Sequence, residues 1–331
     1  MSRSEFEIIN ELFSPLTLGD PRALGLKDDA AVLALPPDRE LVVTADALVA
    51  GVHFRPEDPP DLIARKALRV NLSDLAAMGA RPEGFFLCAA FPYSTCDSWL
   101  ETFASGLRQD VETFQIPVLG GDTVATPGPL TLSLTALGSV EKGKALRRSF
   151  AQAGDDIYVS GSLGDGALGL KVISEEVSLS ITNHREFLKD RYLLPQPRVA
   201  LGLALVDVPG MGACMDISDG LVQDIGHICR ASGVGAVVEM SQIPLSDATR
   251  SLLKASPELM DSVLTGGDDY ELLFSARSRA RPALAALVSA LGLPITRIGR
   301  IETGAGVVVL DGIGEVRAFP KGGYNHCLGT N

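Results

Sequence analysis

Aspartate recurs along the chain at the ends of short apolar runs, within an apolar helical pattern and beside glycines. Ionised carboxylates are rarely buried without a partner, so several of them among apolar residues predict a shared cationic partner. Oxygen ligands select hard divalent cations such as Mg²⁺, Ca²⁺ or Mn²⁺ over softer metals. The aspartates in these positions are Asp28, Asp29, Asp46, Asp74, Asp122, Asp216 and Asp219.

Each of these aspartates alone has an ordinary structural explanation. An aspartate before a glycine usually forms a turn or an N-cap, and Asp219 is placed to cap a helix that begins at Leu221. Asp74 differs, because it falls in the middle of a helical pattern, one turn after Asn71, and is predicted to point inward. The aspartates taken together therefore indicate a cation site more strongly than any one of them does.

Two of the aspartate segments combine a carboxylate with a second kind of ligand. An extended Asp-Ile-Ser-Asp-Gly segment would put Asp216 and Ser218 on one face and let Asp219 begin a turn. The segment Gly120-Gly121-Asp122 sets backbone N–H groups beside a carboxylate, which suits phosphate oxygens that share a metal ion. Both segments favour phosphate chemistry assisted by divalent cations.

The elements that must position these residues alternate between strand-like and helix-like patterns, which predicts an α/β or α+β architecture. Asp46 is expected to close one short strand, and Gly120 to follow another. The predicted strands are 41–45, 118–119, 131–137, 156–160, 236–239, 271–275 and 307–310, and the predicted helices are 62–78, 98–114, 221–232 and 279–291. The polar stretch 175–191 fits neither pattern.

A charged stretch over residues 141–154 separates two strand-like runs and is the predicted domain boundary. At 331 residues the chain is long enough for two domains with separate cores. We therefore expect an N-terminal domain over residues 1–140 and a C-terminal α/β domain over residues 141–331.

The composition argues against several classes of protein. The formal charge of −12, without a stripe of Lys and Arg, argues against nucleic-acid binding. Neither a signal sequence nor a long apolar span is visible, which predicts no membrane association and a cytoplasmic location. The five scattered cysteines lack Cys-x-x-Cys spacing and are expected to be reduced thiols.

The common nucleotide-binding fingerprints do not explain the chain. No Gly-x-x-x-x-Gly-Lys-Ser/Thr segment is present, which excludes a P-loop. Residues 164–169 match Gly-x-Gly-x-x-Gly after a strand, but Asp165 would place a negative charge against a pyrophosphate. Asp190, near the expected acidic position, does not follow a strand. A tight turn from strand to helix explains the match better.

The motifs taken together resemble the thiamine-monophosphate kinase family over essentially the whole chain. Two blocks are highly specific together, Asn-Leu-Ser-Asp-Leu-Ala-Ala-Met-Gly-Ala at 71–80 and Asp-Ile-Ser-Asp-Gly-Leu at 216–221. The other matching segments, in family order, are 28–32, Asp46 with 51–54, 120–123, 266–272 and 323–326. The resemblance implies a two-domain, aminoimidazole ribonucleotide synthetase-like fold, whose N-terminal domain binds ATP and Mg²⁺ and pairs in a homodimer.

The resemblance also implies roles for individual residues. The Mg²⁺ ligands would be Asp29, Thr44, Asp46, Asp74, Asp122, Asp216 and Asp219. The ATP-contacting residues would be Gly121, Asp122, Arg148 and Ser218. The residues facing thiamine monophosphate would be His53, Asp268 and Tyr324. Asp46, Asp74, Asp122, Arg148 and Asp219 would carry the catalysis.

Three positions depart from the family pattern. Asp268 stands where the family usually has glutamate in Gly-Gly-Glu-Asp-Tyr-Glu, which shortens the side chain by one methylene. Lys27 stands where a glycine commonly precedes the Asp pair, and Leu194 where an arginine is frequent. The first departure bears on the substrate contact, and the other two bear on loop geometry.

The implied reaction transfers the γ-phosphoryl group of ATP onto thiamine monophosphate, with several Mg²⁺ ions and without a strong general base. Two alternatives remain open, a related ATP-dependent synthetase of purine biosynthesis and a non-catalytic sensor of Mg²⁺-nucleotide. Two residues also keep alternative explanations, because Arg148 would serve equally as a solvated linker charge and Tyr324 as a packing residue.

Overall fold

A computed structural model describes residues 4–319 and 322–324 of the chain. The chain divides into two compact units. The first holds the residues up to Leu75 together with Ala80–Lys144, and the second holds Ala76–Gly79 together with the chain from Ala145 onward. Within the described residues, no helix is long and apolar enough to cross a membrane.

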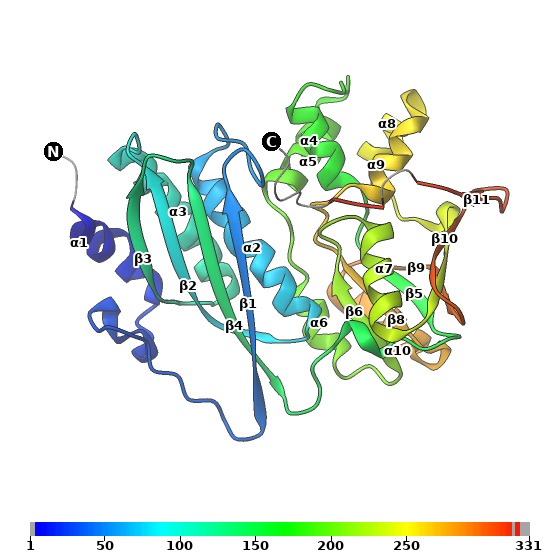
Figure 1. Cartoon of the computed structure of the whole chain (residues 1–331), viewed down its shortest axis with the longest axis horizontal. Helices are drawn as coiled ribbons and strands as arrows, with labels where there is room; N and C mark the ends of the chain where they lie inside the picture. The colour runs from blue at the N-terminus through cyan, green and yellow to red at the C-terminus, as the bar shows by residue number, and fades with distance from the viewer. Residues whose placement is uncertain (1–3, 320–321, 325–331) are drawn as a thin grey trace. The chain divides into compact units, whose positions relative to one another are not determined.

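The first unit is built on a four-stranded sheet with the order β1-β4-β2-β3 (Figure 1). Strands β2 and β3 run parallel, and the other pairs are antiparallel. The strands are β1 (Arg39–Val49), β2 (Arg81–Pro92), β3 (Val118–Thr126) and β4 (Thr131–Glu141), and the helices are α1 (Glu5–Ile8), α2 (Pro60–Ala77) and α3 (Asp97–Phe114). Short helical turns cover Ile9–Phe13, Ser14–Thr17 and Pro21–Leu26.

Helices α2 and α3 cover one face of this sheet. Phe91 of β2 contacts Trp99 and Phe103 of α3 edge-on, with ring centroids 6.0 and 5.9 Å apart. The two helices are joined by a buried ion pair, in which Arg69 Nε lies 2.6 Å from Asp110 Oδ2. Leu72 of α2 is fully buried, which contributes about 1.5–3 kcal/mol for one such side chain.

The second unit is built on a seven-stranded sheet with the order β11-β10-β7-β9-β5-β8-β6. Among its described strands only β7 and β10 pair in parallel, so the unit is α+β rather than doubly wound. Its strands are β5 (Asp156–Ser160), β6 (Met211–Asp216), β7 (Gly235–Glu239), β8 (Leu272–Ala276), β9 (Ile295–Glu302), β10 (Gly306–Leu310) and β11 (Val316–Arg317).

Seven helices of the second unit pack around this sheet in the described part of the chain. They are α4 (Asp165–Ile173), α5 (Thr182–Leu193), α6 (Val199–Leu205), α7 (Leu221–Ser232), α8 (Asp247–Ala255), α9 (Met260–Thr265) and α10 (Arg281–Leu291). Shorter turns cover Arg148–Phe150, Met240–Gln242, Pro257–Leu259 and Ser278–Ala280.

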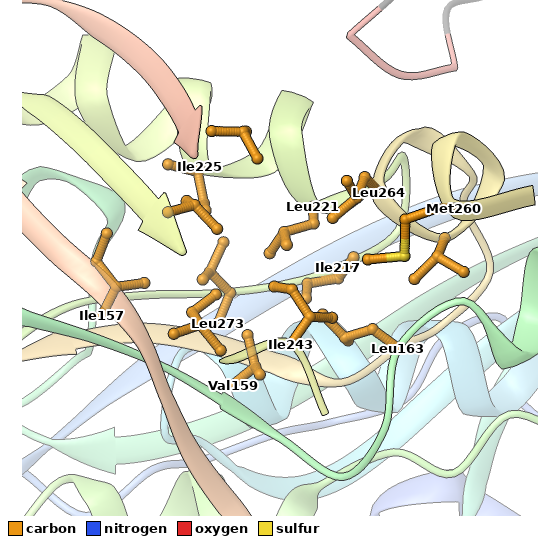
Figure 2. Packing of buried hydrophobic residues seen from close by; sticks show 14 of the residues in the cluster. Ile157, Val159, Leu163, Ile217, Leu221, Ile225, Ile243, Met260, Leu264 and Leu273 are labelled. Carbon is orange, nitrogen blue, oxygen red and sulfur yellow. The ribbon is translucent and has the colours of Figure 1, made fainter. Parts of the chain in front are cut away.

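Both faces of the second sheet are buried, because successive residues of its central strands join two different cores. Ile157 and Val159 of β5 join the core that Figure 2 shows, together with Leu221 and Ile225 of α7. Tyr158, between them in β5, points to the other core, which contains Leu201, Leu284 and Phe274. A strand that is buried on both faces shows a continuous apolar run, which is the pattern of β5.

The predicted elements are present, but several predicted strands were too short. β1 continues to Val49, so Asp46 lies inside the strand and does not close it. β3 continues to Thr126, so Gly120-Gly121-Asp122 is strand and not a loop. In both cases backbone pairing with neighbouring strands outweighs the low strand propensity of Asp and Gly. The unassigned polar stretch contains α5. The elements that were not predicted also include the strands β2, β6, β9 and β11 and the helices α1, α6, α8 and α9.

Candidate active site

Thr44, Asp46 and Asp74 gather on the helix-covered face of the first sheet. Thr44 and Asp46 are two residues apart in β1 and therefore point to the same side. Thr44 Oγ1 donates a hydrogen bond of 2.5 Å to Asp74 Oδ2, so Asp74 points from α2 toward the sheet, as its inward position in the helix predicts. Burial raises the pKa of Asp46, because its ionised form is less stable away from water. A nearby cation would stabilise the ionised form.

The side chain of Asn71 bears on whether Thr44, Asp46 and Asp74 suit a cation. Its Nδ2 donates to the carbonyl of Ala67 at 3.0 Å, one turn earlier in α2. Its Oδ1 is buried, one turn before Asp74, and has no hydrogen-bond partner among the described residues. An orphaned amide oxygen one helical turn from Asp74 adds a further oxygen donor to this group, and such oxygen donors fit Mg²⁺.

Asp122 lies on the opposite face of the first sheet from Asp46. In the strand register Asp46 pairs with Leu134, whereas Asp122 pairs with Cys88, which pairs with Ser133. Directly paired residues share a face and neighbours in a strand alternate, so Asp46 and Asp122 point to opposite sides. One chain therefore does not bring all the predicted metal ligands of the first unit into one cluster.

Asp122 instead meets the N-terminal segment across a cavity of about 370 Å³. Asp28 and Asp29 line this cavity beside Gly120 and Gly121, and its remaining walls are apolar. The apolar side includes Phe13, Leu26 and Phe86. Asp29 and Asp122 are thus brought together, as the aspartate pattern predicts, but apart from Thr44 and Asp74.

His53 follows β1 in a tight turn. Its Nδ1 accepts a hydrogen bond of 3.0 Å from the backbone N–H of Val49. This contact fixes the neutral ring with its proton on Nε2. The imidazole therefore has a defined orientation beside the end of β1.

In the second unit, Asp216 is the last residue of β6, and the segment that follows carries Ser218 and Asp219. It is paired by its backbone to the segment 266–271. Ile217 N–H donates to the carbonyl of Glu271 at 2.9 Å, and Asp268 N–H donates to the carbonyl of Ser218 at 3.0 Å. A Cβ on Gly267 would lie 2.2 Å from the Ser218 oxygen, so this close approach requires glycine.

Asp224 holds the same segment from inside α7. Its Oδ2 accepts the backbone N–H groups of Ser218, Asp219 and Gly220 at 3.1, 3.1 and 3.2 Å. Asp219 itself makes no capping bond to α7, whose N-cap is Gly220, so the capping explanation for Asp219 was wrong. Burial, and then the neighbouring charge of Asp219, raise the pKa of Asp224 to about 7.

Asp219, Asp224 and His227 form a cluster whose ligand atoms all lie within 4.8 Å of one another. Arg148 belongs to the same neighbourhood, because its charge lowers the pKa of both Asp224 and His227, although burial is the larger influence on each. The Arg148 carbonyl accepts a hydrogen bond of 2.8 Å from Ser232 at the end of α7. Arg148 is exposed and lies near Asp224 and His227, so its contribution to the site stays a prediction.

The segment that carries Asp268 is held by two buried carboxylates that the sequence did not single out. Asp269 accepts the N–H groups of Gly164 and Gly166 at 2.8 and 3.1 Å. Glu271 accepts hydrogen bonds from Arg191 at 2.9 Å and from Arg198 Nε at 2.6 Å. Burial raises the pKa of Asp269 to about 8.

Asp268 and Tyr270, on either side of Asp269, have left-handed backbones, with φ of +68° and +51°. Few residues other than glycine adopt this conformation, and it is concentrated at functional positions. The segment is therefore held in an unfavourable backbone by strong polar contacts.

Tyr324 lies at the start of α7. Its N–H donates to the Asp219 carbonyl at 3.0 Å, and its side chain is half-exposed. This contact places a predicted substrate residue against a predicted metal ligand. Asn325 and His326, which complete the family motif, lie outside the described residues.

The Gly-x-Gly-x-x-Gly match proves to be a tight turn between β5 and α4, as predicted. Gly164 has φ of +81° at the start of α4. Asp165 is fully buried and accepts hydrogen bonds from Ser246 at 2.6 Å and Thr249 at 2.8 Å. The side chain that would oppose a pyrophosphate is thus engaged in packing α4 against α8.

Three residues of the second unit, Gln223, Asp224 and Glu271, were not predicted from the sequence. Asp224 is an acidic residue in the first turn of a helix, a common surface feature that gives no sign of burial. Gln223 precedes it and contacts both Asp219 and Tyr324. Glu271 is the last residue of the family motif Gly-Gly-Glu-Asp-Tyr-Glu, in which Asp268 alone was predicted to belong to the site. Each was hidden because burial depends on neighbours distant in the sequence.

The comparisons with known proteins agree on one family. Residues 27–140 match the family model described as AIR synthase related protein, N-terminal domain, and residues 152–312 match its C-terminal domain. A thiamine-monophosphate kinase from Caulobacter vibrioides is 43% identical over 307 residues, which are 92% of this chain and 86% of that protein.

Solved structures support the same assignment. Thiamine-monophosphate kinase from Stenotrophomonas maltophilia K279a matches with a TM-score of 0.84 and 45% identity, covering 93% of this chain and 97% of that one. AaThiL complexed with AMPPCP and TMP matches with a TM-score of 0.74 and 30% identity, covering 93% and 95%. These matches confirm the predicted two-domain fold. The chain belongs to the thiamine-monophosphate kinase family.

Proposed function

We propose that this chain catalyses the ATP-dependent phosphorylation of thiamine monophosphate, giving thiamine diphosphate and ADP. The observation that carries the proposal is a pair of oxygen-rich groups in a chain of this family. One group is Thr44, Asp46 and Asp74, and the other is the segment 216–220 beside Arg148. The relatives named for this reaction match over most of this chain.

The acceptor needs little activation by the protein. A phosphate monoester has a second pKa near 6, so thiamine monophosphate is mostly a dianion at neutral pH. One of its phosphate oxygens forms a bond to the γ-phosphorus of ATP, while the bond from that phosphorus to the β,γ-bridging oxygen breaks. The barrier lies in bringing two polyanions together, so positioning and charge neutralisation dominate.

Mg²⁺ is the cation that this site suits best. When bound, it would neutralise the phosphate oxygens that both substrates bring to the site. Mg²⁺ ions would be held by Thr44, Asp46 and Asp74 on one face of the first sheet, by Asp29 and Asp122 on its other face, and by Asp216 and Asp219 in the second unit. These residues are oxygen ligands throughout, and the orphaned Asn71 Oδ1 lies one turn from Asp74.

Other residues of the chain would bind and orient the substrates. Arg148 would offer a guanidinium to the triphosphate, and Gly121, Asp122 and Ser218 would also contact it. His53 and Asp268 would face the acceptor, and Tyr324 would stack on its cationic thiazolium or its pyrimidine ring. The residues proposed to carry the catalysis are Asp46, Asp74, Asp122, Arg148 and Asp219.

We also propose that the first unit, besides binding ATP and Mg²⁺, pairs with a second copy of the chain. Leu41, Val43, Ala45 and Ala47 of β1 form an exposed apolar row on the face away from α2. Leu41 and Val43 are 48% and 55% exposed, and β1 is an edge strand. Sedimentation should give a dimer for the natural chain, and Val43→Lys should shift it toward monomer.

A coupled assay of ADP release with thiamine monophosphate, and mass detection of thiamine diphosphate, tests the reaction. Turnover with an aminoimidazole precursor instead would favour the related synthetase of purine biosynthesis. Binding of Mg²⁺-ATP without consumption would favour a non-catalytic sensor. The cytoplasmic location stays a prediction.

A further inference from the structure

Gln223, in the first turn of α7, touches a predicted metal ligand and a predicted substrate residue at once. Its Nε2 donates a hydrogen bond to Asp219 Oδ2 at 3.1 Å and another to the Tyr324 carbonyl at 2.6 Å. Both partner atoms are acceptors, so the amide nitrogen faces them and both of its hydrogens are used.

Two further contacts press the segment 322–324 onto the same place. The Tyr324 N–H donates to the Asp219 carbonyl at 3.0 Å. A Cβ on Gly323 would lie 2.5 Å from Gln223 Cβ and 2.7 Å from the Asp219 oxygen. Only glycine allows the backbone to approach this closely without displacing its neighbours.

Asp219 has a second anchor, which Gln223 does not touch. Its N–H donates to Asp224 Oδ2 at 3.1 Å, together with the N–H groups on either side. The loss of the Gln223 amide would therefore leave the backbone of the metal-ligand segment in place. It would release the Tyr324 carbonyl and one oxygen of the Asp219 carboxylate.

Building on the proposed function, we infer that Gln223 is a positioning residue. Together with Asp219, it holds Tyr324 in the position from which Tyr324 would contact thiamine monophosphate. The bridge consists of Gln223, Asp219, Gly323 and Tyr324. A hydrogen bond to the second oxygen of a ligand carboxylate fixes how that carboxylate is presented. The bridge thereby ties recognition of the acceptor to the orientation of Asp219.

A matched pair of substitutions tests the bridge. Gln223→Met keeps the length of the side chain and removes both donors, whereas Gln223→Lys keeps a donor that both acceptors can share. We expect Gln223→Met to raise the KM for thiamine monophosphate roughly tenfold, the usual effect of losing a hydrogen bond to a charged partner. The KM for ATP should change less than about twofold, and Gln223→Lys should recover much of the loss.

Gly323→Ala attacks the bridge from its other side and provides a second variant if Gln223→Met unfolds. It should raise the KM for thiamine monophosphate without lowering the thermal unfolding midpoint. The control is Gln242→Ala, an exposed glutamine outside the bridge, which should leave both constants unchanged.

The possible outcomes separate this inference from the proposed function. A natural chain that makes no thiamine diphosphate would overturn the function itself. If the natural chain turns over normally and the KM for thiamine monophosphate is unchanged in both Gln223→Met and Gly323→Ala, the bridge is contradicted and the proposed function is not. Equal increases in both KM values would also overturn the bridge, because they would indicate a general structural role.

Discussion

The two acid groups of the molecule are positioned by different means. In the first unit, Thr44 and Asp46 project from β1 and Asp74 from α2, so regular hydrogen-bonded elements set their places. In the second unit, Asp216, Ser218 and Asp219 extend from the end of a strand into an irregular segment. Regular elements position side chains more precisely than loops do.

The irregular segments of the second unit are stabilised instead by buried carboxylates. Asp224 binds the backbone of 218–220, Asp269 binds the turn before α4, and Glu271 binds two arginines. Backbone N–H groups that helices and sheets would satisfy internally are satisfied here by side chains. A loop-borne site therefore depends on residues that never touch the substrate.

The largest expected effect is in the first unit, at Asp74. Asp74→Asn removes one ligand charge and should lower kcat at least about a thousandfold, an effect of about 4 kcal/mol. The fold should persist, because the amide can still accept the Thr44 hydrogen bond. Asp61→Asn, on the same helix, is the matched control for the assay of ADP release. Retained turnover in Asp74→Asn would contradict the metal-binding role.

In the second unit a substitution should affect stability as well as turnover, because Asp224 stabilises the backbone of the site segment. Asp224→Ala leaves three backbone N–H groups without their acceptor and should cost about 2–4 kcal/mol of unfolding free energy. Turnover should fall roughly a hundredfold, in the range for residues that orient ligands. Urea unfolding and steady-state kinetics measure the two effects. Asp224→Asn, which keeps an acceptor oxygen, should lose less of both, and equal losses would undermine the comparison.

A smaller effect is expected for the exposed ring of Tyr324. Tyr324→Ala removes the predicted stacking partner and should raise the KM for thiamine monophosphate roughly tenfold, with little change for ATP. Tyr93→Ala, an exposed tyrosine of the first unit, should change neither constant. A matched rise in both KM values would show that Tyr324 does not face the acceptor.

The last expected effect is on stability alone, as a pH dependence that belongs to the second unit. Asp269 titrates near pH 8 in the folded chain, because burial raises its pKa, and near 3.9 when unfolded. The folded state therefore binds the extra proton between about pH 4 and pH 8, and this contribution to stability is lost as pH rises through that window.

Thermal unfolding at pH 5 and pH 8 measures this contribution. Asp269→Asn should show a flatter pH dependence of stability, because the amide does not titrate. Asp38→Asn, an exposed aspartate of the first unit, should leave the slope unchanged. If stability changes with pH as steeply in Asp269→Asn as in the natural chain, other groups cause the pH dependence.

The sequence predicts the regular half of the site better than the irregular half. The spacing of apolar residues predicts α2 and α7 almost to the residue, and with α2 the inward position of Asp74. Strand ends were predicted less well, since Asp46 and Gly121 interrupt apolar runs that sheet pairing continues. The opposite orientations of Asp46 and Asp122 follow only from the register of three strand pairs, which join all four strands of the sheet.

The left-handed backbones of Asp268 and Tyr270 carry a consequence for the evolution of this protein. Each such residue costs about 1–2 kcal/mol that glycine would not. Selection for heat resistance alone would favour glycine at these two positions. At position 268 glycine would also remove the carboxylate that is proposed to contact the substrate, so stability and substrate recognition impose opposite demands on that residue.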